Sequence, residues 1–247
     1  MLELFQITND AAFAQRCDDL GGFRLFVDLE RMGKAERQAG RNTFISAHLL
    51  LDVGRSEEVE AVLGEGADML MLPMFRTADD VRTFIDIVGG RAPVVTLLET
   101  ADALACIDSW VATPGLAEVF VGLNDLHLSL GCRFMFEPLA RGLVDRVAGS
   151  AKAHGLRFGF GGIARLDEGQ LPGRDVLAEH LRLGSGAVIL SRTFHRPGEG
   201  GSFEEEVAKL RAAEALLARR APAEIEADRV RIAAIIDTIA AGMGAAR

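Results

Sequence analysis

Short apolar runs alternate with longer amphipathic segments along most of the chain. The short runs are rich in β-branched residues and stop at Gly, Pro or an acidic residue, which is typical of buried strands. The longer segments repeat apolar residues with helical spacing, and several begin at a capping residue and end at Gly. The pattern predicts strands at residues 2–7, 23–27, 68–74, 93–98, 118–125, 156–160 and 187–190. It predicts helices at about residues 10–20, 57–63, 78–88, 101–111, 138–154, 172–183, 203–219 and 223–240.

This alternation of strand and helix predicts an α/β fold with a parallel sheet, either a barrel or a doubly wound sheet. Polar side chains of possible chemical use follow several different strands, which favours the barrel. We therefore predict a single domain over residues 1–247, a (β/α)8 TIM barrel at about 2–200 with extra C-terminal helices at 203–240. The last helix carries an isoleucine stripe that could pack on its own barrel or cover a neighbouring subunit: Ile225, Ile232, Ile236 and Ile239.

The pattern supplies seven strands, whereas a barrel of this type has eight. The missing one is the third strand, which would fall between Glu30 and Asp68. Residues 44–53 could form a degenerate third strand, or the chain could lack a segment near Val53 and Gly54. Both interpretations remain open at this point.

Composition excludes several classes of partner. The net charge of −9 and the pI of about 5.1 argue against nucleic acid and anionic membranes. No uninterrupted apolar run approaches the ~20 residues that span a bilayer, and the N-terminal residues do not form a signal peptide. Three widely spaced cysteines without a CxxC pair suit reduced thiols, so we expect a cytoplasmic protein. A small anionic substrate stays compatible with the charge, because a local cation outweighs a distant net charge.

Two of the predicted strands end on a carboxylate. Glu99 follows residues 93–98, and Asp125 follows the apolar run that begins at Glu118. Neighbouring strands lie ~5 Å apart, so the two side chains could hold one divalent cation between them. Asp125 taken alone could equally cap the following helix.

Four motifs occur in a characteristic order and spacing: Phe26-Val27-Asp28-Leu29-Glu30, Gly66-Ala67-Asp68-Met69-Leu70-Met71-Leu72-Pro73-Met74, Leu98-Glu99-Thr100 and Val121-Gly122-Leu123-Asn124-Asp125-Leu126. In these motifs the chain resembles the HpcH/HpaI aldolase and citrate lyase β-subunit family of the phosphoenolpyruvate/pyruvate barrel superfamily, over roughly residues 2–194. The resemblance implies a (β/α)8 barrel and a homo-oligomer, for which we expect a trimer or hexamer. It also implies a divalent cation (Mg²⁺, Mn²⁺ or Co²⁺) on a Glu and an Asp, which correspond to Glu99 and Asp125.

The family's aldolases cleave or form a carbon–carbon bond next to a 2-oxo acid such as pyruvate. A 2-oxo acid can chelate a cation through its carboxylate and ketone oxygens, and the cation then acts as a Lewis acid on the enolate. Hard oxygen ligands suit such ions, and water fills the remaining positions. The backbone N–H groups of Gly122, Leu123 and Asn124 could face the substrate carboxylate, although Gly122 could simply form a tight turn.

The chain also departs from the family pattern. The aldolase branch has an acid/base histidine after its Asp-x-Glu motif, but here Arg31 follows Glu30. The family's carboxylate-binding arginine belongs to the missing third strand, and Arg31, Arg55 and Arg76 are the candidates to replace it. His127, two positions beyond Asp125, could take part in proton transfer near neutral pH or could simply pack in its loop.

We therefore predict a metal-dependent carbon–carbon lyase of the aldolase type, acting on a 2-oxo or hydroxy acid. Glu30, Arg31 and His127 are the predicted catalytic residues, and Arg76 with residues 122–124 the predicted substrate-binding residues. Three alternatives remain: an acyl-CoA lyase, which Lys34 and Arg37 would suit, a lyase on a phosphorylated substrate bound by the loops at 159–163 and 191–193, and a barrel without lyase activity that works in binding or assembly.

Overall fold

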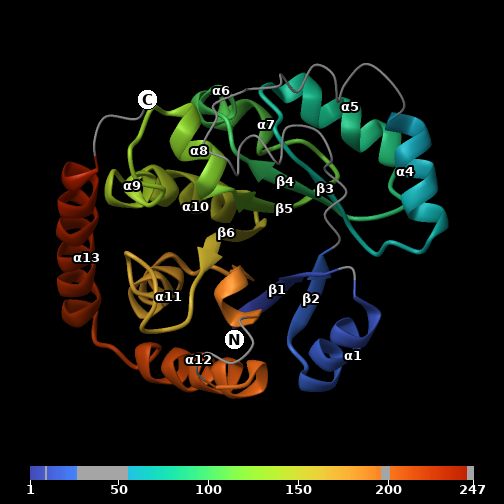
Figure 1. The fold of residues 1–247 in the computed structure, drawn as a ribbon. Helices are drawn as coiled ribbons and strands as arrows, with labels where there is room; N and C mark the ends of the chain where they lie inside the picture. Colours follow the sequence, from blue (N-terminus) through green and yellow to red (C-terminus); the bar gives the residue numbers. More distant parts are fainter. Residues whose placement is uncertain (9, 27–54, 196–200, 244–247) are drawn as a thin grey trace.

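The computed structural model describes residues 1–8, 10–26, 55–195 and 201–243. Seven parallel strands form one curled sheet, with helices packed around its outer side (Figure 1). The strands are β1 (Glu3–Ile7), β2 (Phe23–Phe26), β3 (Leu70–Leu72), β4 (Val94–Leu98), β5 (Leu116–Val121), β6 (Arg157–Ile163) and β7 (Ala187–Leu190). All seven predicted strands are present, and β7 has the predicted bounds.

The helices follow the strands in the predicted alternation. They are α1 (Ala11–Leu20), α4 (Arg55–Gly64), α5 (Ala78–Val88), α6 (Ala101–Ala105), α7 (Ile107–Trp110), α8 (Leu123–Ser129), α9 (Glu137–Ala140), α10 (Leu143–Ala153), α11 (Gly173–Leu183), α12 (Phe203–Leu217) and α13 (Pro222–Gly242), with a 3-10 turn, η1, at Arg192–His195. Side-chain caps explain several starts: Asp10 caps α1, and a capping box of Thr77 and Asp80 begins α5 at the predicted residue. None of the helices in these ranges is long and apolar enough to cross a bilayer.

The order of the strands in the sheet is β2-β1-β7-β6-β5-β4-β3, so the first strand pairs with the last. This pairing brings the two ends of the strand series together, as in a barrel. In the described part of the chain, β2 and β3 are the two outer strands of the sheet. Residues 44–53, the candidate third strand, lie outside the described residues. The fold is therefore α/β with a curled parallel sheet, and closure by an eighth strand stays a prediction.

Packing across the concave face of the sheet confirms the curl. Phe5 of β1 stacks on Phe120 of β5 with ring centroids 5.4 Å apart, although two other strands separate β1 from β5 in the sheet. Val95 and Ala187 complete this inner cluster. The alternate residues of the same strands face outward and form the larger core under the helices.

An ion-pair cluster fills the concave face at the end where the strands begin, here called the amino end. Arg24 of β2 lies 2.6 Å from both Glu3 of β1 and Glu118 of β5. Arg157 of β6 lies 3.1 Å from Glu3 and 3.6 Å from Glu118. The Arg24 guanidinium also covers the Phe5 ring at 4.6 Å. Each carboxylate of the cluster thus faces two guanidinium groups, which fits a structural role.

Three helical segments differ from the prediction. The helix predicted over 101–111 is two short helices with Cys106 between them, and the one predicted over 138–154 is divided at Gly142, whose φ of 69° interrupts helical geometry. The segment after Gly122 is helix α8 rather than a continuation of the strand to Asp125. Helix α8 has only seven residues, too few for a helical period of apolar positions to stand out in the sequence.

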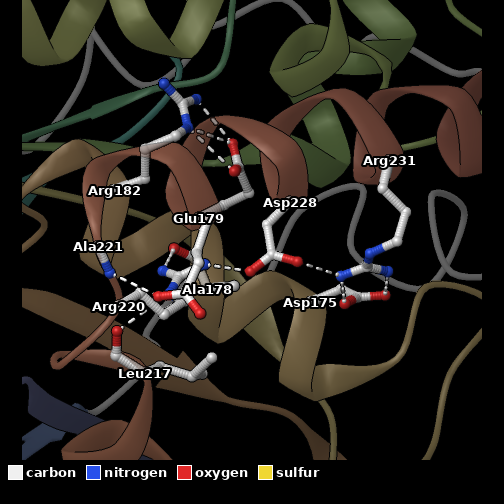
Figure 2. Close-up of polar contacts among 10 residues, drawn as sticks. Asp175, Ala178, Glu179, Arg182, Leu217, Arg220, Ala221, Asp228 and Arg231 are labelled. Carbon is white, nitrogen blue, oxygen red and sulfur yellow. Dashed lines mark hydrogen bonds and ion pairs between the residues drawn. The ribbon is translucent and has the colours of Figure 1, made fainter.

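The C-terminal helices pack on the rest of the described chain. Ile232 and Ile236 of α13 are buried, and α13 contacts α9 and α11. Figure 2 shows the polar contacts that join α11, α12 and α13, here called the C-terminal clamp. Arg231 donates to Asp175 and Asp228, Arg220 to Asp228 and the Ala178 carbonyl, and Arg182 to Glu179. This agrees with the interpretation that α13 packs on its own barrel, while its use at a subunit interface stays a prediction.

Candidate functional site

Glu99 lies at the carboxyl end of the sheet, where the parallel strands end. It continues the alternation of Val95 and Leu97, whose side chains pack in the inner cluster, so its side chain belongs to the concave face. The residue is only 8 % exposed. The backbone N–H of Met74, just after β3, donates to Glu99 Oε2 at 3.2 Å. The carboxylate is therefore held between the ends of two neighbouring strands.

Gly122 makes room for this carboxylate. It follows Phe120 by two positions, so it too lies on the concave face, at the end of β5. A Cβ placed on Gly122 would lie 2.6 Å from Glu99 Cγ and 2.7 Å from Glu99 Oε1. Real carbon atoms do not approach so closely, so any larger residue would force the Glu99 side chain to move. The three strand ends β3, β4 and β5 thus meet at one side chain.

Met74 has an unusual backbone conformation beside Glu99. Its φ is 53°, and it is the one non-glycine residue with positive φ in the described ranges. Such a conformation costs about 1–2 kcal/mol for an L-residue. Strained residues of this kind are concentrated at functional sites, where the surrounding structure holds them. No local pattern in the chain signals this strain, because Met is not a residue typical of left-handed positions.

Asp125 occupies the first turn of α8, three residues after Gly122. The N-cap residue is Gly122, so the alternative in which Asp125 caps the helix is wrong. Asp125 thus lies close in sequence to Gly122, the residue that contacts Glu99. Its side chain is half-buried, whereas that of Asn124 is exposed.

His127 is held by its own helix. Its Nδ1 lies 3.1 Å from the Leu123 carbonyl oxygen, and because a carbonyl only accepts, Nδ1 carries the proton in this contact. The ring is half-buried. Nε2 is then the ring atom that can exchange a proton.

Arg76 is held against α6. Its Nη1 lies 3.8 Å from Asp102 Oδ2, its carbonyl oxygen accepts from the Cys106 thiol at 3.4 Å, and its backbone N–H donates to Asp80. Its Nε is buried without a hydrogen-bond partner. The predicted catalytic residues Glu30 and Arg31 lie outside the described residues, as do Lys34, Arg37 and the side chain of Arg55.

The acidic groups fit a divalent cation only in part. No cluster of three or more His, Cys, Asp or Glu side chains able to hold a metal occurs in the described ranges. Glu99 and Asp125 would therefore supply two carboxylates, and water or substrate oxygens the rest, which is common for Mg²⁺. The space that Gly122 leaves for the Glu99 carboxylate is the structural observation that favours such a site.

The other candidates from the sequence take structural positions. Cβ atoms at Gly159 and Gly161 would meet the side chains of Phe120 and Leu123 at 2.7 and 2.9 Å, so packing explains these glycines without phosphate. His180 is fully buried and stacks on Phe160 at 3.7 Å. Burial lowers the pKa of His180 to about 3, so this histidine is a neutral core residue at physiological pH.

A cavity of about 270 Å³ lies elsewhere, among helices α9, α10, α11 and α13. Its lining residues include Arg141, Asp145 and Arg182 and no residue of a strand. Arg182 is already paired with Glu179 and Asp145. The cavity is therefore separate from the strand ends that carry Glu99.

Comparisons with known proteins were made on this background. No family model matches the chain. The (3S)-malyl-CoA thioesterase of Cereibacter sphaeroides is 32 % identical over 102 residues, which are 40 % of this chain and 35 % of that protein. The match thus spans about a third of the length of the curated relative.

Solved structures match over nearly the whole chain. Protein CitE from Mycobacterium tuberculosis in complex with magnesium and acetoacetate has a TM-score of 0.60 at 16 % identity, covering 95 % of this chain and 97 % of that one. The same protein with magnesium and pyruvate has a TM-score of 0.57 at 18 % identity, covering 87 % and 98 %. The HpcH/HpaI aldolase from Desulfitobacterium hafniense has a TM-score of 0.56 at 16 % identity, covering 90 % and 94 %. The resemblance predicted from sequence is therefore confirmed: the chain has the fold of the HpcH/HpaI aldolase and citrate lyase β-subunit structures.

Proposed function

We propose that the protein is a divalent-metal-dependent lyase that cleaves or forms a carbon–carbon bond next to a 2-oxo acid. The observation that carries the proposal is the Glu99 carboxylate, held at the carboxyl end of the sheet between the Met74 N–H and Gly122. Active sites of parallel barrels lie at this end. The complexes of the similar CitE protein with magnesium and either pyruvate or acetoacetate support the choice of cation and substrate class.

In this proposal Glu99 and Asp125 hold the cation. A bound divalent ion supplies Lewis-acid stabilisation of the negative charge that develops on the 2-oxo acid when the bond breaks. The protein itself positions the two carboxylates and limits the access of water to them. Burial of Glu99 and the first-turn position of Asp125 serve these purposes.

Substrate binding and proton transfer fall to the remaining predicted residues. Arg76, or Arg31, binds the substrate carboxylate, assisted by Asn124 and the backbone N–H of Leu123. The N–H of Gly122, also expected from the sequence to face the substrate, instead donates to the Leu98 carbonyl at 3.0 Å. Protons move through Nε2 of His127 or through Glu30. Because the Leu123 carbonyl fixes the proton on Nδ1, His127 can act as a base only at Nε2.

Pyruvate release from a panel of 4-hydroxy-2-oxo acids, measured with and without Mn²⁺, tests the proposal. We expect metal-dependent turnover that Glu99→Ala and Asp125→Ala each reduce at least about 100-fold, as expected when a charge-stabilising group is lost. Asp108→Ala is the matched control, because Asp108 is an exposed acid on α7, 3.6 Å from Arg146. Equal Mn²⁺ binding by wild type and both site variants would refute the assignment.

Thioester hydrolysis of an acyl-CoA is the second candidate, favoured by the match to a malyl-CoA thioesterase. Here water adds to the thioester carbonyl and the CoA thiol leaves, with no carbon–carbon bond broken. Malyl-CoA separates the two candidates: hydrolysis releases the thiol with free malate, and cleavage of the carbon chain releases an aldehyde instead. Binding of a metal and a 2-oxo acid without either reaction would favour the third alternative, a barrel that works in binding or assembly.

A further inference from the structure

Two unusual features of the backbone meet independently at Glu99. One is the left-handed backbone at Met74, and the other is the absence of a side chain at Gly122. Neither residue carries a chemical group of its own. Each affects only how the Glu99 carboxylate is placed.

The Met74 contact fixes one oxygen of Glu99. The φ of 53° directs the Met74 N–H toward Glu99 Oε2, at 3.2 Å, and both residues are buried. Thr100, the next residue, donates from Oγ1 to the Phe75 carbonyl at 2.7 Å and caps α6 with the same oxygen. Two adjacent pairs, 74 with 99 and 75 with 100, thus join the end of β3 to the end of β4.

The contact with Gly122 fixes the Oε1 side of the Glu99 carboxylate. Oε1 and Cγ of Glu99 lie where a Cβ of residue 122 would be, so the carboxylate rests directly on the backbone of β5. The backbone N–H of Gly122 donates to the Leu98 carbonyl at 3.0 Å, which keeps this backbone in place beside β4. The carboxylate is therefore confined from two sides by main chain.

We propose that Met74 and Gly122 are positioning residues that hold the Glu99 carboxylate in one orientation, and that this rigidity makes the site select Mn²⁺ and Mg²⁺ over Ca²⁺. This inference rests on the proposed function, in which Glu99 binds a cation. Mg²⁺ demands near-ideal octahedral geometry from its ligands, whereas Ca²⁺ takes six to eight oxygens and often two from one carboxylate. A carboxylate that cannot turn suits the first requirement better than the second.

The first experiment needs no metal. Amide hydrogen exchange at Met74 is measured in the metal-free wild type and in Glu99→Ala, with the β5 amides as internal reference. We expect exchange at Met74 to become at least about 10-fold faster in the variant, while β5 is unchanged, because only a local hydrogen bond is lost. Unchanged exchange at Met74 would overturn its positioning role, whether or not the protein binds metal.

The second experiment measures dissociation constants for Mn²⁺ and Ca²⁺ by calorimetry in wild type, Gly122→Ala and Gly162→Ala. Gly162 is the matched control: it is a glycine near the end of β6 without positive φ, and its added Cβ would make only an ordinary contact at 3.7 Å. We expect Gly122→Ala to weaken Mn²⁺ binding at least about 10-fold and to reduce the preference for Mn²⁺ over Ca²⁺. Gly162→Ala should keep both constants within about twofold.

The outcomes are distinguishable. Wild-type affinity and preference in Gly122→Ala would overturn the role of Gly122 while leaving the proposed function intact. A wild type that binds neither cation would refute the proposed function and the selectivity together, and the exchange data would still decide whether Met74 holds Glu99. If Gly122→Ala does not fold, equal affinity of the wild type for Mn²⁺ and Ca²⁺ would by itself contradict the selectivity.

Discussion

The two ends of the curled sheet hold buried carboxylates in opposite ways. At the amino end, Glu118 is 1 % exposed and faces the guanidinium groups of Arg24 and Arg157. At the carboxyl end, Glu99 is nearly as buried but accepts from the Met74 backbone and rests on Gly122. The carboxylate of Glu118 is neutralised by two guanidinium groups at the end of the sheet that is structural in barrels, whereas that of Glu99 contacts the backbone at three strand ends. Burial alone therefore does not distinguish the two carboxylates, and their surroundings must be compared.

The largest expected effect is on stability at the amino end. Glu118→Ala removes the buried acid of the cluster, while the partly buried Arg24 and the exposed Arg157 keep their pairs with Glu3. Loss of the charged hydrogen bond from Arg24 should cost up to about 3 kcal/mol of unfolding free energy. Urea denaturation measures this loss. Glu226→Ala is the control, because Glu226 pairs with Arg229 on the exposed face of α13, where a pair contributes less than about 1 kcal/mol. Similar losses in the two variants would mean that the ion pairs of Glu118 contribute no more to stability than an exposed pair.

Glu99→Gln, unlike Glu118→Ala, should leave stability nearly unchanged and weaken cation binding. It keeps the size of the side chain and an oxygen that can accept from Met74, so we expect the unfolding free energy to change by less than about 1 kcal/mol. Mn²⁺ affinity should fall at least about 100-fold, or about 2.7 kcal/mol, because the charge that binds the cation is lost. Calorimetry measures the Mn²⁺ affinity, and urea denaturation of the same samples measures the unfolding free energy. A large loss of stability with Mn²⁺ binding preserved would place Glu99 in the same class as Glu118.

How much of this site could be foreseen follows from the range of each interaction. The helix at 78–88 was predicted to the residue because its cap, apolar spacing and final glycine are local signals. Glu99 and Asp125 could be named because each follows a predicted strand and because their motifs resemble a known family. The ion pair between Arg24 and Glu118 was not foreseen, because the two residues meet only through the order of the strands.

Local signals also failed in one respect. The strain at Met74 and the steric role of Gly122 depend on contacts with Glu99, which is distant in sequence from both. A glycine after a strand predicts a turn. Nothing in the sequence shows that the Glu99 carboxylate occupies the space that a Cβ of Gly122 would fill. Helix α8 was missed for a different reason, since its seven residues are too few to show a helical period.

A third prediction concerns a neutral group on the outer face of the sheet. The pKa of His180, about 3 in the folded protein, lies below the value near 6.5 expected in the unfolded chain, so only the unfolded chain gains this proton as the pH falls below about 6.5. The resulting stability is complete above that pH and declines by about 1.4 kcal/mol per pH unit below it, or about 2 kcal/mol between pH 6.5 and 5.

Urea denaturation at pH 7 and pH 5 tests this in wild type, His180→Gln and His154→Gln. The decline should shrink in His180→Gln and persist in His154→Gln, because His154 is exposed at the end of α10. A wild-type decline that His180→Gln does not reduce would show that other groups, including those at the ends of the sheet, set the acid sensitivity.

The smallest expected effect concerns the C-terminal clamp. Arg231→Ala removes contacts to Asp175 and Asp228, but Arg231 is half-exposed, so we expect a loss of about 1 kcal/mol in unfolding free energy. Arg229→Ala, which removes a single exposed pair with Glu226, should cost less. Mn²⁺ affinity should be unchanged in both variants. A change in Mn²⁺ affinity would mean that the C-terminal clamp is coupled to the carboxyl end of the sheet.

The pairing of β1 with β7 has a consequence for synthesis on the ribosome. β1 emerges first and can align with β2 soon afterwards, but its other neighbour is translated only when most of the chain is complete. The inner cluster has the same dependence, since Phe5 needs Phe120 and Ala187. The nascent N-terminal segment must therefore keep one strand edge open for most of translation, and native contacts between residues so far apart favour slow, late assembly of the sheet.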